Sequence, residues 1–258
     1  MPINLPLKNN KKLGQLLERI NQDAELHQWW RSANINAVDR SGISDHGEVH
    51  IRIVANAALK LLRLLEEAGI EMSVVAHHKL TSQDAEVIVV LAACLHDVGM
   101  IVHREDHERY SLILGAPKAK ALLEGLYPER ERTTMTGEVL HAMIAHRWDV
   151  RPLTIEASVL KVADALDMTE GRSRIPFQAG EVNIHSVSAA AIESVSLKRG
   201  KADKPIVIEI AMNNSAGIFQ VDELLKRKLS NSTIAPYVQV IARIESETEK
   251  RLVEVYSL

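Results

Sequence analysis

The sequence contains few of the residues that mark several common classes of protein. Its 258 residues include one cysteine, 12 glycines, 8 prolines and only 3% aromatic residues. The single Cys94 excludes an intrachain disulfide and fits a reducing compartment. Sparse glycine and proline exclude a fibrous or disordered chain. Because aromatic residues are few, the core must be built from Leu, Ile, Val and Ala, which suits packed helices.

Strong net charge and long hydrophobic runs are also absent. The formal net charge of -3 gives no general electrostatic case for binding nucleic acid. The longest apolar run, residues 87–95, is too short to cross a bilayer, and the N-terminus has no apolar segment typical of a secretion signal. We therefore expect a cytoplasmic protein with no membrane partner.

The spacing of apolar residues predicts a helical first part. Residues 10–31 fit one helix, and Ser44 or Asp45 is a candidate cap for a second helix that ends near Gly69. Further helices are expected over residues 82–96, from Asp106 until Pro117 interrupts the pattern, over residues 136–146 and over residues 154–166.

The pattern changes after Gly171. Residues 195–197 and 205–212 are typical of strands, and the second strand alternates strongly, with Ile206, Ile208, Ile210 and Met212 on one face. Two helices are expected after these strands, near residues 220–229 and 234–254.

These patterns predict a mainly α protein with two parts. Residues 1–175 would form a helical bundle with helix 10–31 packed on it, and residues 176–258 a small α+β domain, which we call the C-terminal appendage. The apolar strand face must be covered by the appendage's own helices, by the bundle or by another subunit. We expect a homodimer, and we expect the appendage to act in association or regulation more than in chemistry.

The most informative motif is the run Leu95-His96-Asp97-Val98-Gly99, which closes an apolar helical pattern. The pair is a weak signal alone, because adjacent helical residues point about 100° apart and reach one ion only where the helix passes beside it. Further candidate ligands surround it at wide intervals, each beside or within an apolar helical pattern: His50, His107, His146 and Asp164.

This series resembles the HD-domain superfamily of metal-dependent phosphohydrolases. The family pattern is H…HD…D, extended to H…HD…H…H…D in members with two metals, and the resemblance covers roughly residues 44–170. It implies an HD-domain helical bundle in which His50, His96, Asp97 and Asp164 converge on one metal. His96 and Asp97 would be the catalytic pair, with Asp97 between two ions.

His107 and His146 match the two additional ligands of two-metal members. The resemblance therefore implies two divalent ions (Mn, Mg, Ni, Zn or Fe), which acidify a bridging water that serves as the nucleophile. Several alternatives stay open: His46 for His50, Asp167 for Asp164, His103 for His107 and His141 for His146. Glu108, Glu138 and Asp149 are candidates to accept the second ring N–H of a ligand histidine.

Phosphate requires cations, and several basic residues follow the motif elements closely. Arg104, Arg147, Arg172 and Arg174 are candidate substrate contacts because the planar guanidinium offers paired donors, and His46 is a further candidate. We expect a phosphohydrolase acting on an ester or anhydride of a small substrate such as a nucleotide. The alternatives are a di-iron oxygenase on the same fold and a non-catalytic ligand sensor, and the identity of the metal separates hydrolysis from oxygenation.

Overall fold

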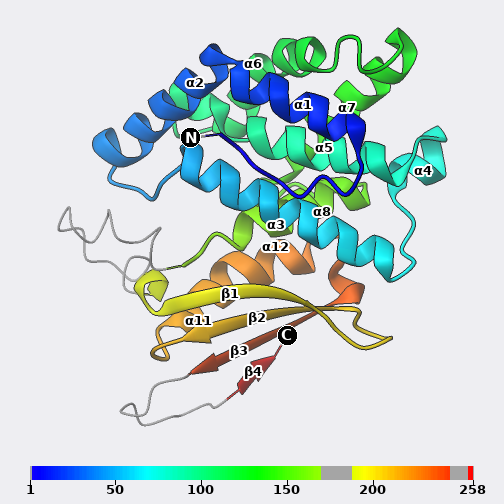
Figure 1. The fold of residues 1–258 in the computed structure, drawn as a ribbon. Helices are drawn as coiled ribbons and strands as arrows, with labels where there is room; N and C mark the ends of the chain where they lie inside the picture. Colours follow the sequence, from blue (N-terminus) through cyan, green and yellow to red (C-terminus); the bar gives the residue numbers. More distant parts are fainter. Residues whose placement is uncertain (1, 170–187, 245–254, 258) are drawn as a thin grey trace.

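The computed structural model describes residues 2–169, 188–244 and 255–257. Its first part is a bundle of helices and its last part a small sheet with one helical crossover (Figure 1). The predicted fold class, a helical bundle with a small α+β appendage, is confirmed. The bundle contains α1 (Lys11–Gln22), α2 (Ala24–Asn34), α3 (Glu48–Glu67), α4 (Ser73–His78), α5 (Ser82–Leu95), α6 (His107–Leu122), α7 (Glu129–Ala145) and α8 (Ile155–Ala165).

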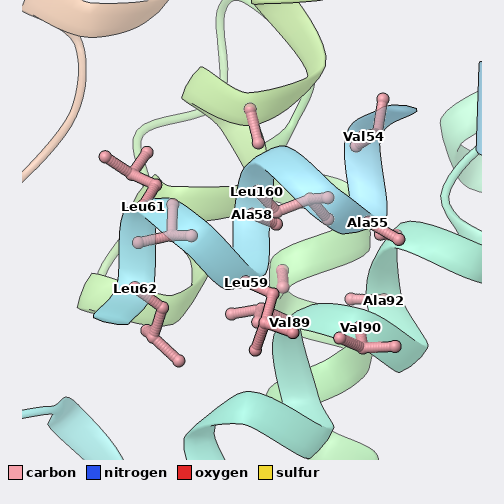
Figure 2. Close-up of a cluster of buried hydrophobic side chains, with 14 of the residues drawn as sticks. Val54, Ala55, Ala58, Leu59, Leu61, Leu62, Val89, Val90, Ala92 and Leu160 are labelled. Carbon is pink, nitrogen blue, oxygen red and sulfur yellow. The ribbon is translucent and has the colours of Figure 1, made fainter. Parts of the chain in front are cut away.

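Helix α5 runs through the middle of the bundle. It begins with a reciprocal cap between Thr81 and Asp84, and every residue from Asp84 to Leu95 is buried. Such a helix, apolar on all sides, requires neighbours all around it. Helices α3 and α8 cover two of its sides, as Figure 2 shows for the side chains Val54, Ala55, Ala58, Leu59, Leu61, Leu62, Val89, Val90, Ala92 and Leu160.

The first predicted helix is two helices in the structure. The prediction of one helix over residues 10–31 was wrong, because the backbone at Asp23 is extended and its carboxylate accepts a hydrogen bond from the Leu26 amide. Asp23 therefore ends α1 and caps α2. Trp30 on α2 donates to the carbonyl of Cys94 over 2.8 Å, which ties α2 to the end of α5.

Three other helix boundaries differ from the predictions. Helix α3 begins at Glu48, and the Asp45 carboxylate caps it from outside by accepting from the His50 amide over 3.1 Å. Pro117 lies inside α6 and does not end it, because the ring is on the exposed face, where water can bond the freed carbonyl. Helix α7 begins at Glu129, seven residues before the predicted start.

The appendage contains a four-stranded sheet in the order β1-β2-β3-β4. Strands β1 and β2 pair antiparallel, β2 and β3 parallel, and β3 and β4 antiparallel. A continuous helical stretch over residues 217–230 makes the parallel crossover and ends in α12. The bounds are β1 (Ile192–Arg199), β2 (Ile206–Met212), α11 (Gly217–Gln220), α12 (Arg227–Ser230), β3 (Val238–Ile244) and β4 (Val255–Ser257).

The prediction of a helix over residues 234–254 was wrong over residues 238–244, which form β3, and a short 3-10 turn over residues 235–237 precedes the strand. Val238, Val240, Ala242 and Ile244 are buried and alternate with more exposed residues along β3. This period of two fits a strand, and the strand forms because β2 offers it a parallel partner over its whole length. Residues 245–254 lie outside the described part of the chain.

The apolar face of β2 is covered within the chain. Ile206, Ile208, Ile210 and Met212 are at most 1% exposed, and they belong to the same apolar cluster as the helical bundle. In Figure 1, α12 lies between the bundle and the sheet. The strand face therefore needs no second subunit, and the homodimer stays a prediction without this support.

The predicted boundary near residue 175 falls within residues 170–187, outside the described residues. No described helix is both long and apolar enough to span a membrane.

Candidate metal centre

Six side chains converge at the C-terminal end of α5. They come from five helices or helix ends: His50 from the first turn of α3, His96 and Asp97 directly after α5, His107 from the start of α6, His146 directly after α7 and Asp164 from the last turn of α8. All six are only 0–9% exposed. The structure thus brings together the six residues that the family resemblance implies as metal ligands.

The first group of donor atoms surrounds one point. Asp97 Oδ2 lies 3.3 Å from His50 Nε2 and 3.2 Å from His96 Nε2, and the two Nε2 atoms are 3.2 Å apart. Asp164 Oδ1 lies 3.3 Å from His50 Nε2 and 3.8 Å from His96 Nε2. Ligand bonds of about 2.0–2.2 Å place tetrahedral ligand atoms about 3.3–3.6 Å apart. This spacing suits a divalent ion.

A second group uses the other oxygen of the same carboxylate. Asp97 Oδ1 lies 3.2 Å from His107 Nε2 and 3.6 Å from His146 Nε2. Both groups, Asp97 with His50 and His96, and Asp97 with His107 and His146, have the spacing of a possible ion site. Asp97 therefore directs one oxygen to each group.

Each of the four histidines has an acceptor for its outer ring nitrogen. His96 Nδ1 donates to the Ala93 carbonyl over 2.8 Å, and His107 Nδ1 donates to the Arg104 carbonyl over 2.9 Å. His146 Nδ1 donates in the same way to the carbonyl of Met143. The His96 and His146 acceptors are in the last turn of a helix, where carbonyls have no helical partner. These bonds hold a proton on Nδ1, so that an ion would bind at Nε2 in place of any proton there.

His50 is the exception, because its acceptor is a side chain. Its Nδ1 donates to Asp167 Oδ2 over 2.6 Å, and Asp167 is only 4% exposed. Asp167 is therefore a partner of a candidate ligand, and its carboxylate is not one of the groups around either site. The prediction that Glu138 or Asp149 accepts from a ligand histidine was wrong. Glu138 pairs with His78, and Asp149 pairs with Arg147. Glu108 lies 3.5 Å from His107 Nδ1, farther than the backbone acceptor.

The close charges shift the pKa values of this cluster in opposite directions. Burial opposes ionisation of Asp97, yet the surrounding histidines, led by His96, hold its pKa well below the usual range. Burial also opposes protonation of His96, but the charges and hydrogen bonds of Asp97 and Asp164 together outweigh it and raise the pKa to about 9. His146 is buried beside the positive charge of His96, and both effects lower its pKa to about 3. The charge states of Asp97 and His96 therefore depend on each other.

The competing histidines lie outside both groups. The ring of His46 is 5.5 Å from that of His50, and its Nδ1 donates to the Ser44 carbonyl over 2.6 Å. His103 is exposed and accepts from the Glu105 amide, and His141 accepts from the Leu153 amide. His103 and His141 thus serve backbone amides, whereas His46 lies beside His50.

The predicted arginine contacts are only partly placed. The Arg104 side chain is exposed, and Arg147 forms ion pairs with Asp106 over 3.1 Å and with Asp149 over 2.7 Å. Arg172 and Arg174 lie outside the described residues. Lys228, which was not predicted from the sequence, contacts Asp164 Oδ2 with its ammonium from the appendage. No sequence signal could have found this contact, because the two residues are 64 positions apart and in different parts of the fold.

The sequence of this region matches a known protein family. The family model of the HD domain matches residues 48–169, which contain all six clustered side chains. The chain belongs to the HD-domain superfamily. An uncharacterized protein of Methanocaldococcus jannaschii is 44% identical over 232 residues, which is 90% of this chain and 89% of that protein. A match of this length extends beyond the HD domain into the appendage. No solved structure gives a significant match to the chain.

Proposed function

We propose that this HD-domain protein is a phosphohydrolase that cleaves a phosphate ester or anhydride of a small substrate, such as a nucleotide, with two divalent ions. The observation that carries the proposal is the position of Asp97. Its two oxygens face separate pairs of imidazoles, 3.2–3.3 Å away on one side and 3.2–3.6 Å on the other. A carboxylate in this position can bridge two ions about 3.5–4 Å apart.

The donor set fits such ions. Neutral imidazole and carboxylate donors suit Mn, Fe, Ni and Zn, and carboxylate-rich sites also accept Mg. In this proposal His50, His96, Asp97 and Asp164 hold the first ion, and Asp97, His107 and His146 hold the second. When bound, the ions would lower the pKa of a water between them and offset the charge of a phosphoryl oxygen.

The residues of the chain prepare the site for this chemistry. The four Nδ1–H bonds keep the Nε2 lone pairs directed at the two groups, so little rearrangement is needed when an ion binds. Asp97 belongs to both groups and His96 to the first, and these two residues are the proposed catalytic pair. Arg104 and Arg147, together with His46, remain proposed substrate contacts, with Arg172 and Arg174 as further candidates outside the described residues.

Metal analysis followed by a substrate panel tests the proposal. The full chain would be stripped with a chelator, reloaded separately with Mn, Mg, Ni, Zn or Fe, and assayed on phosphomonoesters, phosphodiesters and nucleotides. We expect about two ions per chain and hydrolysis that disappears with the chelator and returns with metal. Absence of hydrolysis with every metal would contradict the proposal, and oxygen consumption by an iron-loaded chain would favour an oxygenase instead.

A further inference from the structure

The appendage contacts the bundle directly beside the metal centre. Lys228 at the start of α12 reaches Asp164, and three residues later Asn231 Nδ2 donates to the Trp148 carbonyl over 3.0 Å. Thr233 bonds Ser158 on α8 twice, through its amide over 3.0 Å and its hydroxyl over 2.8 Å. The segment that carries Lys228 is therefore fixed on both the loop after His146 and helix α8.

The Asp164 carboxylate is divided between the two parts of the protein. Its Oδ1 faces His50 and His96, while its Oδ2 contacts the Lys228 ammonium. The Lys228 and Asp164 side chains are 15% and 11% exposed, so this pair lies near the surface of the centre and not beneath it. Burial opposes ionisation of Asp164, but Lys228 and the two histidines hold its pKa well below the usual range.

A second lysine nearby shows what a purely structural ammonium looks like. Lys161 on α8 is fully buried, and its Nζ donates to the carbonyls of Arg147, Trp148 and Val150 over 2.8, 3.2 and 2.7 Å. An ammonium has three donors, so Lys161 uses all of them. Among the described residues, Lys228 makes one hydrogen bond, the one to Asp164. Lys228 thus has donors to offer to a ligand beside Asp164.

We propose that Lys228 binds the phosphoryl group of the substrate while it holds the outer oxygen of Asp164, so that the appendage completes the active site. This inference rests on the proposed phosphohydrolase function. Lysine binds phosphate as a compact point charge. Arg147, the nearest arginine in the sequence to a candidate ligand, is already paired with Asp106 and Asp149. The role differs from our expectation that the appendage acts mainly in association or regulation.

The chain offers a matched control for Lys228. Lys226 lies two residues earlier on the same helical stretch, where it is exposed and pairs with Asp222 over 3.2 Å. Lys226→Gln removes the same charge from the same part of the appendage without touching Asp164. Lys228→Gln removes the proposed contact, and Lys228→Arg keeps a positive charge at the position.

The experiment measures binding of inorganic phosphate to the metal-loaded full chain by calorimetry, together with metal content and steady-state kinetics. We expect Lys228→Gln to keep its metal, to bind phosphate about 10- to 100-fold more weakly and to raise KM, because a charged hydrogen bond is lost. Lys228→Arg should recover part of the affinity, and Lys226→Gln should stay within about twofold of the wild type.

Three results would overturn the inference, and they are distinguishable. Equal phosphate affinity and KM in Lys228→Gln and Lys226→Gln, with hydrolysis intact, would remove Lys228 from the substrate site. Loss of metal from Lys228→Gln, with normal phosphate affinity in the chains that stay loaded, would reduce Lys228 to a positioning residue for Asp164. A wild type that neither binds phosphate nor hydrolyses esters would overturn the proposed function as well.

Discussion

Helix α5 has buried carboxylates at both ends, and the two ends neutralise them differently. At the N-terminal end, Asp84 and Glu86 are paired with Lys12 over 2.8 Å and Arg63 over 2.6 Å. At the C-terminal end, Asp97 is surrounded by four imidazoles, whose Nε2 atoms lie 3.2–3.6 Å away. The first end has lysine and arginine cations built into the chain, and the second presents imidazoles, which are metal ligands once they are deprotonated.

This difference separates a structural cluster from a binding site. Tyr127 adds a hydrogen bond to Asp84 and Asn10 adds one to Glu86, each over 2.8 Å, so these carboxylates are well satisfied by the protein. The histidines around Asp97 instead use their Nδ1 protons on other acceptors and keep Nε2 directed at the carboxylate. A bound cation would stabilise this end of the helix most, and the proposed function requires such a cation.

The largest expected effect comes from removing the carboxylate shared by both groups. Asp97→Ala should lose both ions and all metal-dependent turnover, because each proposed ion loses a ligand and the two ions lose their bridge. Metal content, hydrolysis and circular dichroism would be measured, and the helical signal should stay unchanged. Asp84→Asn, at the other end of the same helix, should keep metal and turnover, and loss of metal from it would break the comparison.

The next largest effect concerns the second group alone. His107→Ala and His146→Ala should each lower the metal content from about two ions towards one and reduce turnover by orders of magnitude, because Asp97 Oδ1 then lacks an imidazole partner. His141→Ala is the control, since that ring contacts the Leu153 amide and neither group. Full metal content and near-normal rates in both variants would mean a mononuclear centre.

A change beside the N-terminal end of α5 should lower the stability of the fold and leave metal binding intact. Arg63→Met leaves the buried Glu86 carboxylate without its cation, which should lower the free energy of unfolding by about 3–5 kcal/mol. Urea denaturation of the metal-free chain measures this loss. Lys60→Met, an exposed position on the same helix, should change it by less than about 0.5 kcal/mol. A drop in metal content in Arg63→Met would show that the two ends are not independent.

The smallest expected effect is a difference in acid sensitivity. Burial opposes ionisation of Asp84, but Lys12, Thr81 and Tyr127 hold the pKa of its carboxyl below the usual range. The unfolded chain therefore binds this proton first as pH falls, so the stabilisation is present above the unfolded-state pKa and is lost as pH falls through the folded-state pKa. The wild type and Asp84→Asn would be unfolded with urea at several pH values between 7 and 3. The difference between their free energies of unfolding should become smaller only below about pH 4. A constant difference would contradict this.

The helices were predictable where one apolar pattern decides them, and not where a single polar residue or a distant partner does. The uninterrupted apolar run before His96 fixed α5, because such a run must be buried. Asp23 interrupted the first helix because its side chain caps the next one, which apolar spacing does not register. Residues 238–244 have an apolar pattern that does not by itself distinguish a strand from a helix. They form strand β3 because they pair with β2.

The sequence by itself determined which donor types the site contains and in what order they come along the chain. It also placed His96 and His146 just after helices, where a free carbonyl three residues earlier accepts the Nδ1 proton. These are local relations, and a local pattern carries them.

Tertiary structure decided the rest. It chose Asp167, 117 residues from His50, as the acceptor that holds that ring, and it brought Lys228 from the appendage to Asp164. It also gave each oxygen of Asp97 its own pair of imidazoles. These relations depend on how helices and sheet pack against one another, because packing sets the position of a side chain relative to partners that are remote in sequence.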